Sequence, residues 1–199
     1  MTKKTIFLLD PGHGGIAAGH YLTPGKRSPE VPPGIYEGEF NREVCNWIVR
    51  LNAKYHNVIN TNLGPINIPL TSRVSFVNQF CKREKNCALI SLHANAAKKK
   101  GWSKGSGFVI FHSRKASKKS KRLARIMLEE FKSLNYFSSR GIKQANHTVT
   151  TKTNCPAILI ECGFMTNKHD AELLADPITR HRIARVIAQG MDQYVEAQN

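Results

Sequence analysis

The sequence lacks long hydrophobic runs and is short of acidic residues. Its 199 residues include 30 Lys and Arg but only 14 Asp and Glu, so the formal net charge is +16 at pH 7. A helix that spans a bilayer needs about 20 consecutive apolar residues, and no stretch approaches that length. We therefore exclude an integral membrane protein. After the basic residues Lys3 and Lys4, the apolar run covers only residues 6–9, which is too short for the core of a signal peptide.

The five cysteines are odd in number and irregularly spaced, and no two of them form a CxxC pair. This excludes proteins built around a structural zinc site of paired cysteines and proteins held together by a complete disulfide framework. We expect the thiols to be reduced and mostly buried. They belong to Cys45, Cys81, Cys87, Cys155 and Cys162.

The length and composition are those of one globular domain. A hydrophobic fraction of 41% and a charged fraction of 22% are ordinary values, and the chain is long enough to bury one continuous core. Short apolar runs alternate with amphipathic segments, which is typical of an α/β fold. We predict a single three-layer α/β/α domain over residues 1–199, with a mixed, mostly parallel twisted sheet between the helices.

The expected elements follow from the spacing of apolar residues. Strands are predicted at residues 5–9, 58–61, 88–92, 107–111 and 157–160. A first, amphipathic helix is marked by Phe40, Val44, Trp47, Ile48 and Leu51, which recur at helical spacing. A second, capped by Thr71, should carry Val74, Val77 and Phe80 on one face. A third, which is basic, should turn Leu123, Ile126, Met127, Phe131 and Leu134 inward. The last, opened by Asp176 and Pro177, should bury Ile183, Val186, Ile187, Tyr194 and Val195. Residues 14–36 are expected to form a long loop and residues 138–155 a loop or irregular strand, and long loops in compact domains are often functional.

Three polar residues stand at the ends of predicted strands. His13 follows the first strand, His93 a middle one and Glu161 a late one. In open α/β sheets, reactive groups gather at the carboxyl ends of the strands. These three side chains can therefore share one site, although taken singly each is more often a hydrogen-bonded structural residue.

The residues around these positions form three blocks: Asp-Pro-Gly-His-Gly-Gly at 10–15, Ser-Leu-His-Ala-Asn at 91–95 and Ile-Glu-Cys-Gly-Phe at 160–164. In this order and spacing they resemble the signature blocks of the zinc-dependent N-acetylmuramoyl-L-alanine amidases, the amidase type 3 family. The resemblance covers nearly the whole chain and includes residues 37–41, 70–78 and 139–141. Cys162 stands where aliphatic residues are common in the family. The loop at 19–34 is longer than usual, which could reshape the substrate groove.

The resemblance implies that His13 and His93 bind one zinc ion per chain, together with a glutamate at the start of the first helix. Glu37, four residues before Asn41, is the expected third ligand, and Glu39 is the alternative. A carboxylate at this position also stabilises a helix N-terminus without any metal.

The resemblance further implies that Glu161 is the catalytic glutamate and that the reaction is hydrolysis of the amide bond between N-acetylmuramic acid and L-alanine in bacterial peptidoglycan. Two histidines and one carboxylate leave zinc a position for water, whose pKa the metal lowers to about 7. Glu161 would take the proton of that water and pass it to the leaving nitrogen. Asn95 is expected to support the ligands, to contact the substrate or simply to hold a turn. Asp10 and Arg73 are interpreted as structural.

Two alternatives stay open. A zinc peptidase acting on the peptidoglycan stem peptide would need the same metal site. A nucleic-acid-binding module is suggested by residues 98–122, which hold ten bases and no acid. No nucleic-acid-binding signature accompanies this stretch, so we expect no specific nucleic-acid partner. We expect the stretch either to face an anionic cell-envelope surface or to be a solvated face.

The chain resembles a phage endolysin more than a regulated division enzyme. The strand at 107–111 runs almost directly into the basic helix, which leaves no room for the helical insertion that covers the site in periplasmic family members. No signal peptide and no separate cell-wall-binding domain are visible. We expect a monomer that is synthesised in the cytoplasm and acts on the cell wall in the periplasm, after phage-type release or, for an autolysin, after removal of a signal.

Overall fold

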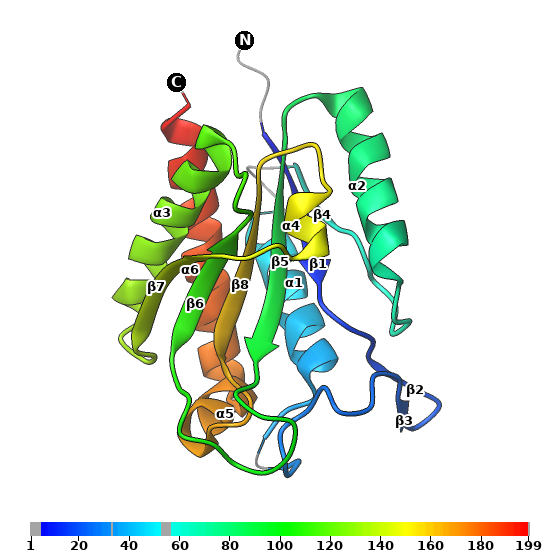
Figure 1. Cartoon of the computed structure of the whole chain (residues 1–199), viewed down its shortest axis with the longest axis vertical. Coiled ribbons are helices and arrows are strands. Elements are labelled where there is room, and N and C mark those ends of the chain that lie inside the picture. The colour runs from blue at the N-terminus through cyan, green and yellow to red at the C-terminus, as the bar shows by residue number, and fades with distance from the viewer. Residues whose placement is uncertain (1–4, 33, 53–56, 199) are drawn as a thin grey trace.

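A six-stranded mixed sheet lies between two layers of helices in the computed structural model, which describes residues 5–32, 34–52 and 57–198 (Figure 1). Its strands are β1 (Ile6–Pro11), β4 (Asn57–Asn60), β5 (Cys87–Asn95), β6 (Phe108–His112), β7 (Ser139–Gln144) and β8 (Ala157–Phe164). The strand order is β4-β1-β5-β8-β6-β7. β6 pairs antiparallel with β8, and the other neighbouring strands are parallel. The predicted fold class is confirmed.

Helices cover both faces of this sheet (Figure 1). One layer holds α1 (Glu37–Asn52), α3 (Lys118–Ser133) and α6 (Pro177–Glu196), with α5 (Lys168–Ala175) leading into α6; the other holds α2 (Leu70–Glu84) and the short α4 (Thr148–Thr151). A two-stranded hairpin, β2 (Ile16–Ala17) and β3 (His20–Tyr21), stands apart from the sheet. Within the described ranges, no helix combines the length and apolar character needed to cross a membrane. The basic residues near the N-terminus, Lys3 and Lys4, lie outside those ranges.

The central strands are buried on both faces. All six residues of β1 are buried, as are the first six of β5. Parallel strands that are covered on both faces have continuous apolar sequences, which explains why residues 6–9 are all hydrophobic. Phe7 and Leu9 enter the core beneath α1, α3 and α6, whereas Ile6 and Leu8 enter the core that Val77 of α2 completes. Each such buried side chain stabilises the fold by about 1.5–3 kcal/mol.

The predicted helices are confirmed, with one error at a helix end. The side chain of Asp176 caps α6 by accepting hydrogen bonds from the backbone of Ile178 and Thr179. The prediction that Thr71 caps α2 is wrong, because that helix begins at Leu70. Its N-cap is Pro69, which has no side-chain hydrogen bond but accepts one at its carbonyl from the backbone of residue 73, at 3.0 Å.

The two stretches predicted as loops differ in outcome. Residues 14–36 are mostly loop, apart from the small hairpin. Residues 138–155 contain the edge strand β7 and the helix α4, and the helix was not predicted. The cysteines are mostly buried as predicted: Cys45, Cys87 and Cys162 fully, and Cys81 and Cys155 partly.

Candidate metal centre and active site

The polar residues singled out in the sequence meet near the carboxyl ends of β1, β5 and β8. His13 follows β1, and α1 contributes Glu37 at its first residue. His93 and Glu161 lie opposite each other on neighbouring parallel strands. Both strands continue past these residues, β5 to Asn95 and β8 to residue 164, so their predicted ends were three and four residues short.

The two histidines surround one oxygen of Glu37. Nε2 of His13 lies 3.3 Å and Nδ1 of His93 lies 2.9 Å from Oε1 of Glu37. One possible ligand atom from each residue falls within 4.8 Å of the other two. Oε2 of Glu37 is buried and has no hydrogen-bond partner among the described residues, which is costly for a carboxylate. A cation held among the three side chains would satisfy this oxygen, so the donor set fits a metal ion.

Glu39, the alternative ligand, lies outside this cluster. Its Oε1 accepts a hydrogen bond from the backbone N of Ile16 at 2.9 Å. It therefore fixes the start of the small hairpin, and the donor cluster contains Glu37 instead.

The loop that carries His13 is held from several sides. His13 has a φ of 64°, a left-handed conformation that is uncommon for residues with a side chain. Arg42 donates from Nη2 to the carbonyl of His13 at 2.7 Å. Asp10 accepts from Arg73 Nη1 at 2.6 Å and from the hydroxyl of Ser91 at 2.7 Å. These buried contacts support the structural interpretation of Asp10 and Arg73, because they hold the backbone in a conformation that it would otherwise disfavour.

Gly12 allows the backbone to pass against the imidazole of His93. A Cβ atom at this position would overlap three atoms of that ring. The carbonyl of Gly12 accepts a hydrogen bond from Nδ2 of Asn41 at 3.0 Å. Glycine is thus required here by a close approach of backbone to side chain.

The protonation states of Glu37 and His93 depend on each other. Burial would raise the pKa of Glu37, but its hydrogen bonds with His13 and His93 outweigh burial and lower that pKa to about 2. Burial would likewise lower the pKa of His93, but the hydrogen bond and charge of Glu37 outweigh it and raise that pKa. The protein alone therefore shifts Glu37 toward the carboxylate and His93 toward the protonated imidazole. A metal ion would take the place of that proton.

The pKa of Glu161 is shifted upward, whereas that of Glu37 is shifted downward. Burial raises the pKa of its carboxyl group to about 7, although the nearby His93 and Lys26 act to lower it. Its Oε2 is buried and makes no hydrogen bond to any described residue. A carboxyl group that titrates near neutral pH can both accept and release a proton during a reaction.

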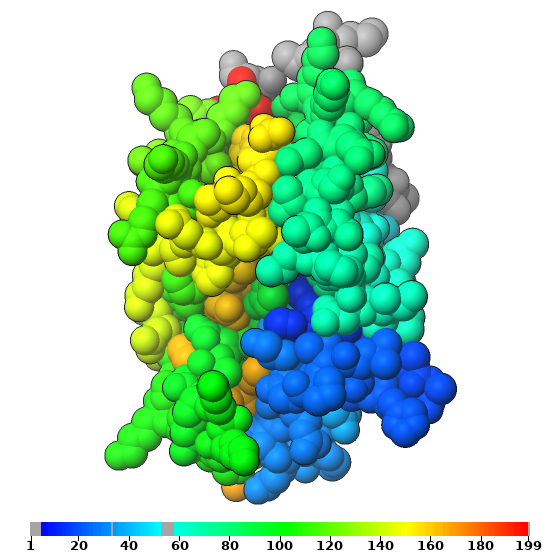
Figure 2. Space-filling model, turned by 45° about the vertical axis from the view of Figure 1, so that its right-hand side comes forward, coloured from blue at the N-terminus to red at the C-terminus, as the bar shows by residue number. Residues whose placement is uncertain are grey.

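A pocket of about 320 Å³ joins these side chains to solvent. Figure 2 shows a hollow between the blue N-terminal segment and the green loop after β5, with part of the orange-brown β8 region at its floor. Asn95 lines the pocket, and its side chain accepts a hydrogen bond from the backbone of Ala96 at 2.7 Å. This contact agrees with the expectation that Asn95 holds a turn.

His147 also lines the pocket, and sequence reasoning missed it. The residue precedes α4, and its ring packs edge-on against Phe111 with centroids 5.0 Å apart. Burial, followed by the charge of His93, lowers the pKa of His147, so the ring is neutral at pH 7. Its Nε2 is buried, and no residue within the described ranges forms a hydrogen bond with it. The residue lies outside the three blocks, and no signal in the sequence distinguishes it from a structural histidine.

Comparison with known proteins identifies the family. The sequence model of the amidase type 3 family, described as N-acetylmuramoyl-L-alanine amidase, matches residues 7–193. The chain is 27% identical over 194 residues to the probable cell wall amidase LytH of Staphylococcus saprophyticus, covering 98% of this chain and 59% of the relative. It is 24% identical over 234 residues to the N-acetylmuramoyl-L-alanine amidase AmiC of Neisseria meningitidis, covering 97% of this chain and 53% of that protein. The chain thus spans between half and three fifths of these two relatives.

Solved structures agree over the full length of the fold. The N-acetylmuramoyl-L-alanine amidase of Clostridium difficile 630 superposes with a TM-score of 0.83 at 26% identity, covering 100% of both chains. The catalytic domain of the amidase CwlV from Bacillus (Paenibacillus) polymyxa gives a TM-score of 0.79 at 25% identity, covering 96% of this chain and 98% of that one. Because the family model covers nearly the whole sequence, the chain belongs to the N-acetylmuramoyl-L-alanine amidase family.

Proposed function

We propose that this protein is a zinc-dependent amidase that hydrolyses the bond between N-acetylmuramic acid and L-alanine in bacterial peptidoglycan. The observation that carries this proposal is the arrangement of one pocket, which is lined both by the donor cluster of His13, Glu37 and His93 and by Glu161, whose Oε2 has no partner among the described residues. Family membership and the cell wall amidases among the relatives support the choice of substrate.

The donor types favour zinc. Two imidazole nitrogens and a carboxylate are a common set for catalytic zinc, and they leave a position open for water. One zinc ion bound there would supply a polarised water molecule and a Lewis acid for the amide carbonyl. His93 must lose its proton for this, and Glu37 is ionised at neutral pH.

Glu161 acts as the proton carrier. It accepts a proton from the attacking water on a carboxylate oxygen and donates it to the nitrogen of L-alanine. A C–O bond forms at the lactyl carbonyl and the C–N bond breaks, which leaves a lactyl carboxylic acid and a free amino group. A pKa near 7 suits both directions of proton transfer at neutral pH.

His147 is proposed to contact the substrate. Its neutral ring can make a hydrogen bond through Nε2, which has no partner in the described part of the chain, and the residue lines the pocket. A substrate that fills the pocket would satisfy this nitrogen, which otherwise stays buried and unpaired.

Digestion of purified peptidoglycan tests the proposal. We expect new amino groups on L-alanine, no cleaved peptide bond, and about one zinc per chain in the active protein. A chelator should abolish activity, and added zinc should restore it. Cleavage within the stem peptide would assign the protein as a peptidase. Full activity of metal-free protein would exclude the zinc mechanism.

A further inference from the structure

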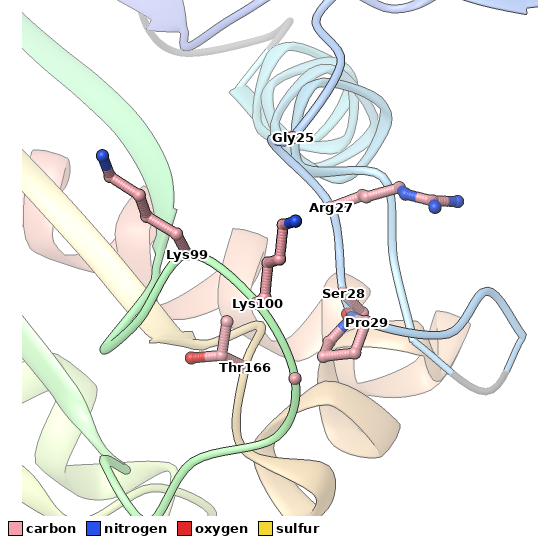
Figure 3. A pocket seen from close by; sticks show the side chains of 8 residues that line it. Gly25, Arg27, Ser28, Pro29, Lys99, Lys100 and Thr166 are labelled. Atoms are coloured by element: carbon pink, nitrogen blue, oxygen red, sulfur yellow. The ribbon is translucent and has the colours of Figure 1, made fainter.

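A second pocket, of about 510 Å³, carries positive charge (Figure 3). It is lined by Gly25, Arg27, Ser28, Pro29, Lys99, Lys100, Gly101 and Thr166. Figure 3 shows Lys100 extending toward the segment that carries Gly25 and Arg27, whereas the side chains of Lys99 and Arg27 point outward to opposite sides of the pocket. Nothing in the proposed reaction uses these cations.

The two pockets are lined by the same three segments of the chain. Lys26, Asn95 and Met165 line the metal pocket. The residues directly after Lys26 and Met165 line the second pocket, and so does the loop that begins four residues beyond Asn95. Four residues of extended chain span at most about 14 Å. The two pockets are therefore neighbours along these three segments, and we refer to them together as the groove.

The segment with Arg27 is attached to the metal site through its backbone. Glu37 donates from its backbone N to the carbonyl of Lys26 at 2.9 Å. The next residue but one, Ser28, is buried and exchanges hydrogen bonds with the backbone of Ile35, at 2.8 and 2.9 Å. Arg27 is thus presented from a fixed position next to a proposed metal ligand.

The loop with the two lysines is anchored at both ends to one residue. Ala97 donates from its backbone to the hydroxyl of Thr166 at 3.0 Å, and Ser103 donates from its backbone to the carbonyl of Thr166 at 2.7 Å. Lys99 and Lys100 lie between these two anchors. Because Thr166 also lines the pocket, the loop is positioned by the pocket wall itself.

The protein does not neutralise these cations. Arg27, Lys99 and Lys100 form no ion pair with any residue in the described parts of the chain. Glu30, the acid nearest to Arg27 in sequence, accepts a hydrogen bond from Nε1 of Trp102 at 3.3 Å. Unpaired charge of one sign in a concave site raises the local concentration of oppositely charged ligands.

The basic stretch at residues 98–122 is divided by β6. Val109 lies opposite Glu161, whereas Phe111, further along β6, lies opposite Leu159. The strand therefore starts beside the reaction centre and leads away from it. The lysines at the start of α3 lie at the other end of the sheet, and only the bases before β6 belong to the groove.

We propose that Arg27, Lys99 and Lys100 form a binding site for carboxylate groups of the peptidoglycan stem peptide. This inference rests on the proposed function and adds a preference: stems with free carboxylates should be cleaved more readily than stems whose carboxylates are amidated. An extended peptide advances about 3.3–3.6 Å per residue, so its second and third residues lie about 7–11 Å from the cleaved bond. The second pocket begins within about 14 Å of Asn95, so carboxylates on these residues of the stem can reach it.

Steady-state kinetics with two soluble muropeptides test this preference, one with free and one with amidated carboxylates. In the variant Lys99→Gln/Lys100→Gln, we expect the KM for the free form to rise about tenfold with little change in kcat, because each exposed ion pair changes affinity by a factor of at most about five. The KM for the amidated form should not change. The matched control, Lys118→Gln/Lys119→Gln, removes the same charge at the far end of the sheet and should behave as wild type on both.

Several outcomes would overturn the inference. These are an unchanged KM for the free form, an equal loss on both muropeptides, or an equal loss in the control. A further arm uses sacculi with and without their phosphate polymers: a loss that depends on those polymers would assign the pocket to envelope phosphate. If wild type cleaves neither muropeptide, the proposed function fails. Equilibrium binding of the two muropeptides to wild type and variant then still decides whether the pocket prefers free carboxylates.

Discussion

Glu161→Gln keeps the shape of the side chain and removes its titration. Oε2 of Glu161 is buried and accepts no hydrogen bond from the residues that the structure describes, and burial raises the pKa of the group from its ordinary 4.5 to about 7. Folding therefore favours the protonated form of this group. Its stabilising contribution is fully present below pH 4.5 and is lost as the pH rises through about 7.

The size of the effect follows from the shift in pKa. A rise from 4.5 to about 7, at 1.36 kcal/mol per unit, corresponds to at most about 3 kcal/mol. Part of the side chain faces the pocket, so screening by water reduces this value. In metal-free protein, the free energy of unfolding of wild type should fall relative to the variant by up to about 3 kcal/mol between pH 4.5 and 8.

Urea unfolding of both proteins in the presence of a chelator, at steps of pH across this range, measures the difference. Glu37 and His93 titrate in both proteins, so most of their contribution cancels. A difference that stays constant with pH, or a wild type that gains stability relative to the variant as the pH rises, would refute the argument. Added zinc should narrow the difference at pH 8, because a nearby cation stabilises the ionised carboxylate.

The remaining predictions concern the other side chains of the pocket. Glu37→Ala should lose bound zinc whereas Glu39→Ala should retain it, as measured by metal analysis; equal zinc in both would contradict the assignment. Gly12→Ala should displace His93 and weaken zinc binding about tenfold or more in competition with a chelator, and unchanged affinity would show that the ring has room to move. His147→Phe should keep zinc but lower kcat on a small muropeptide about tenfold, because a buried hydrogen bond is lost. An unchanged kcat would mean that Nε2 of His147 does not contact the substrate.

The sequence predicts best where chemistry demands particular side chains in a fixed local setting. His13, His93 and Glu161 stand in short blocks whose neighbouring residues have a clear structural purpose, such as Gly12, where the absence of a side chain makes room for the His93 ring. The central strands were also predictable, since burial on both faces leaves an unbroken apolar run. Whether these side chains act in the proposed roles stays a prediction.

Features that depend on tertiary contacts were not predictable. The segment Thr148–Thr151 is too short and too rich in β-branched residues to favour a helix by itself. The helix forms next to α2, where the side chain of Asn78 donates a hydrogen bond to the carbonyl of Lys152 at 2.9 Å and accepts one from the backbone N of Asn154 at 2.7 Å. Likewise, the ten bases at residues 98–122 form one run in sequence. The antiparallel direction of β6, which no local pattern specifies, carries them to two ends of the sheet.

The loop at residues 97–103, which carries Lys99 and Lys100, can vary without disturbing the rest of the site because it is anchored to Thr166. It supplies none of the metal-binding atoms, and its two ends are tied to a single residue that follows β8. Under the proposed function, substitutions or a change of length between residues 97 and 103 would therefore alter which stem peptides are accepted, while the candidate metal centre keeps its geometry. Engineering such an amidase for a different cell wall would begin at this loop and leave the strand ends unchanged.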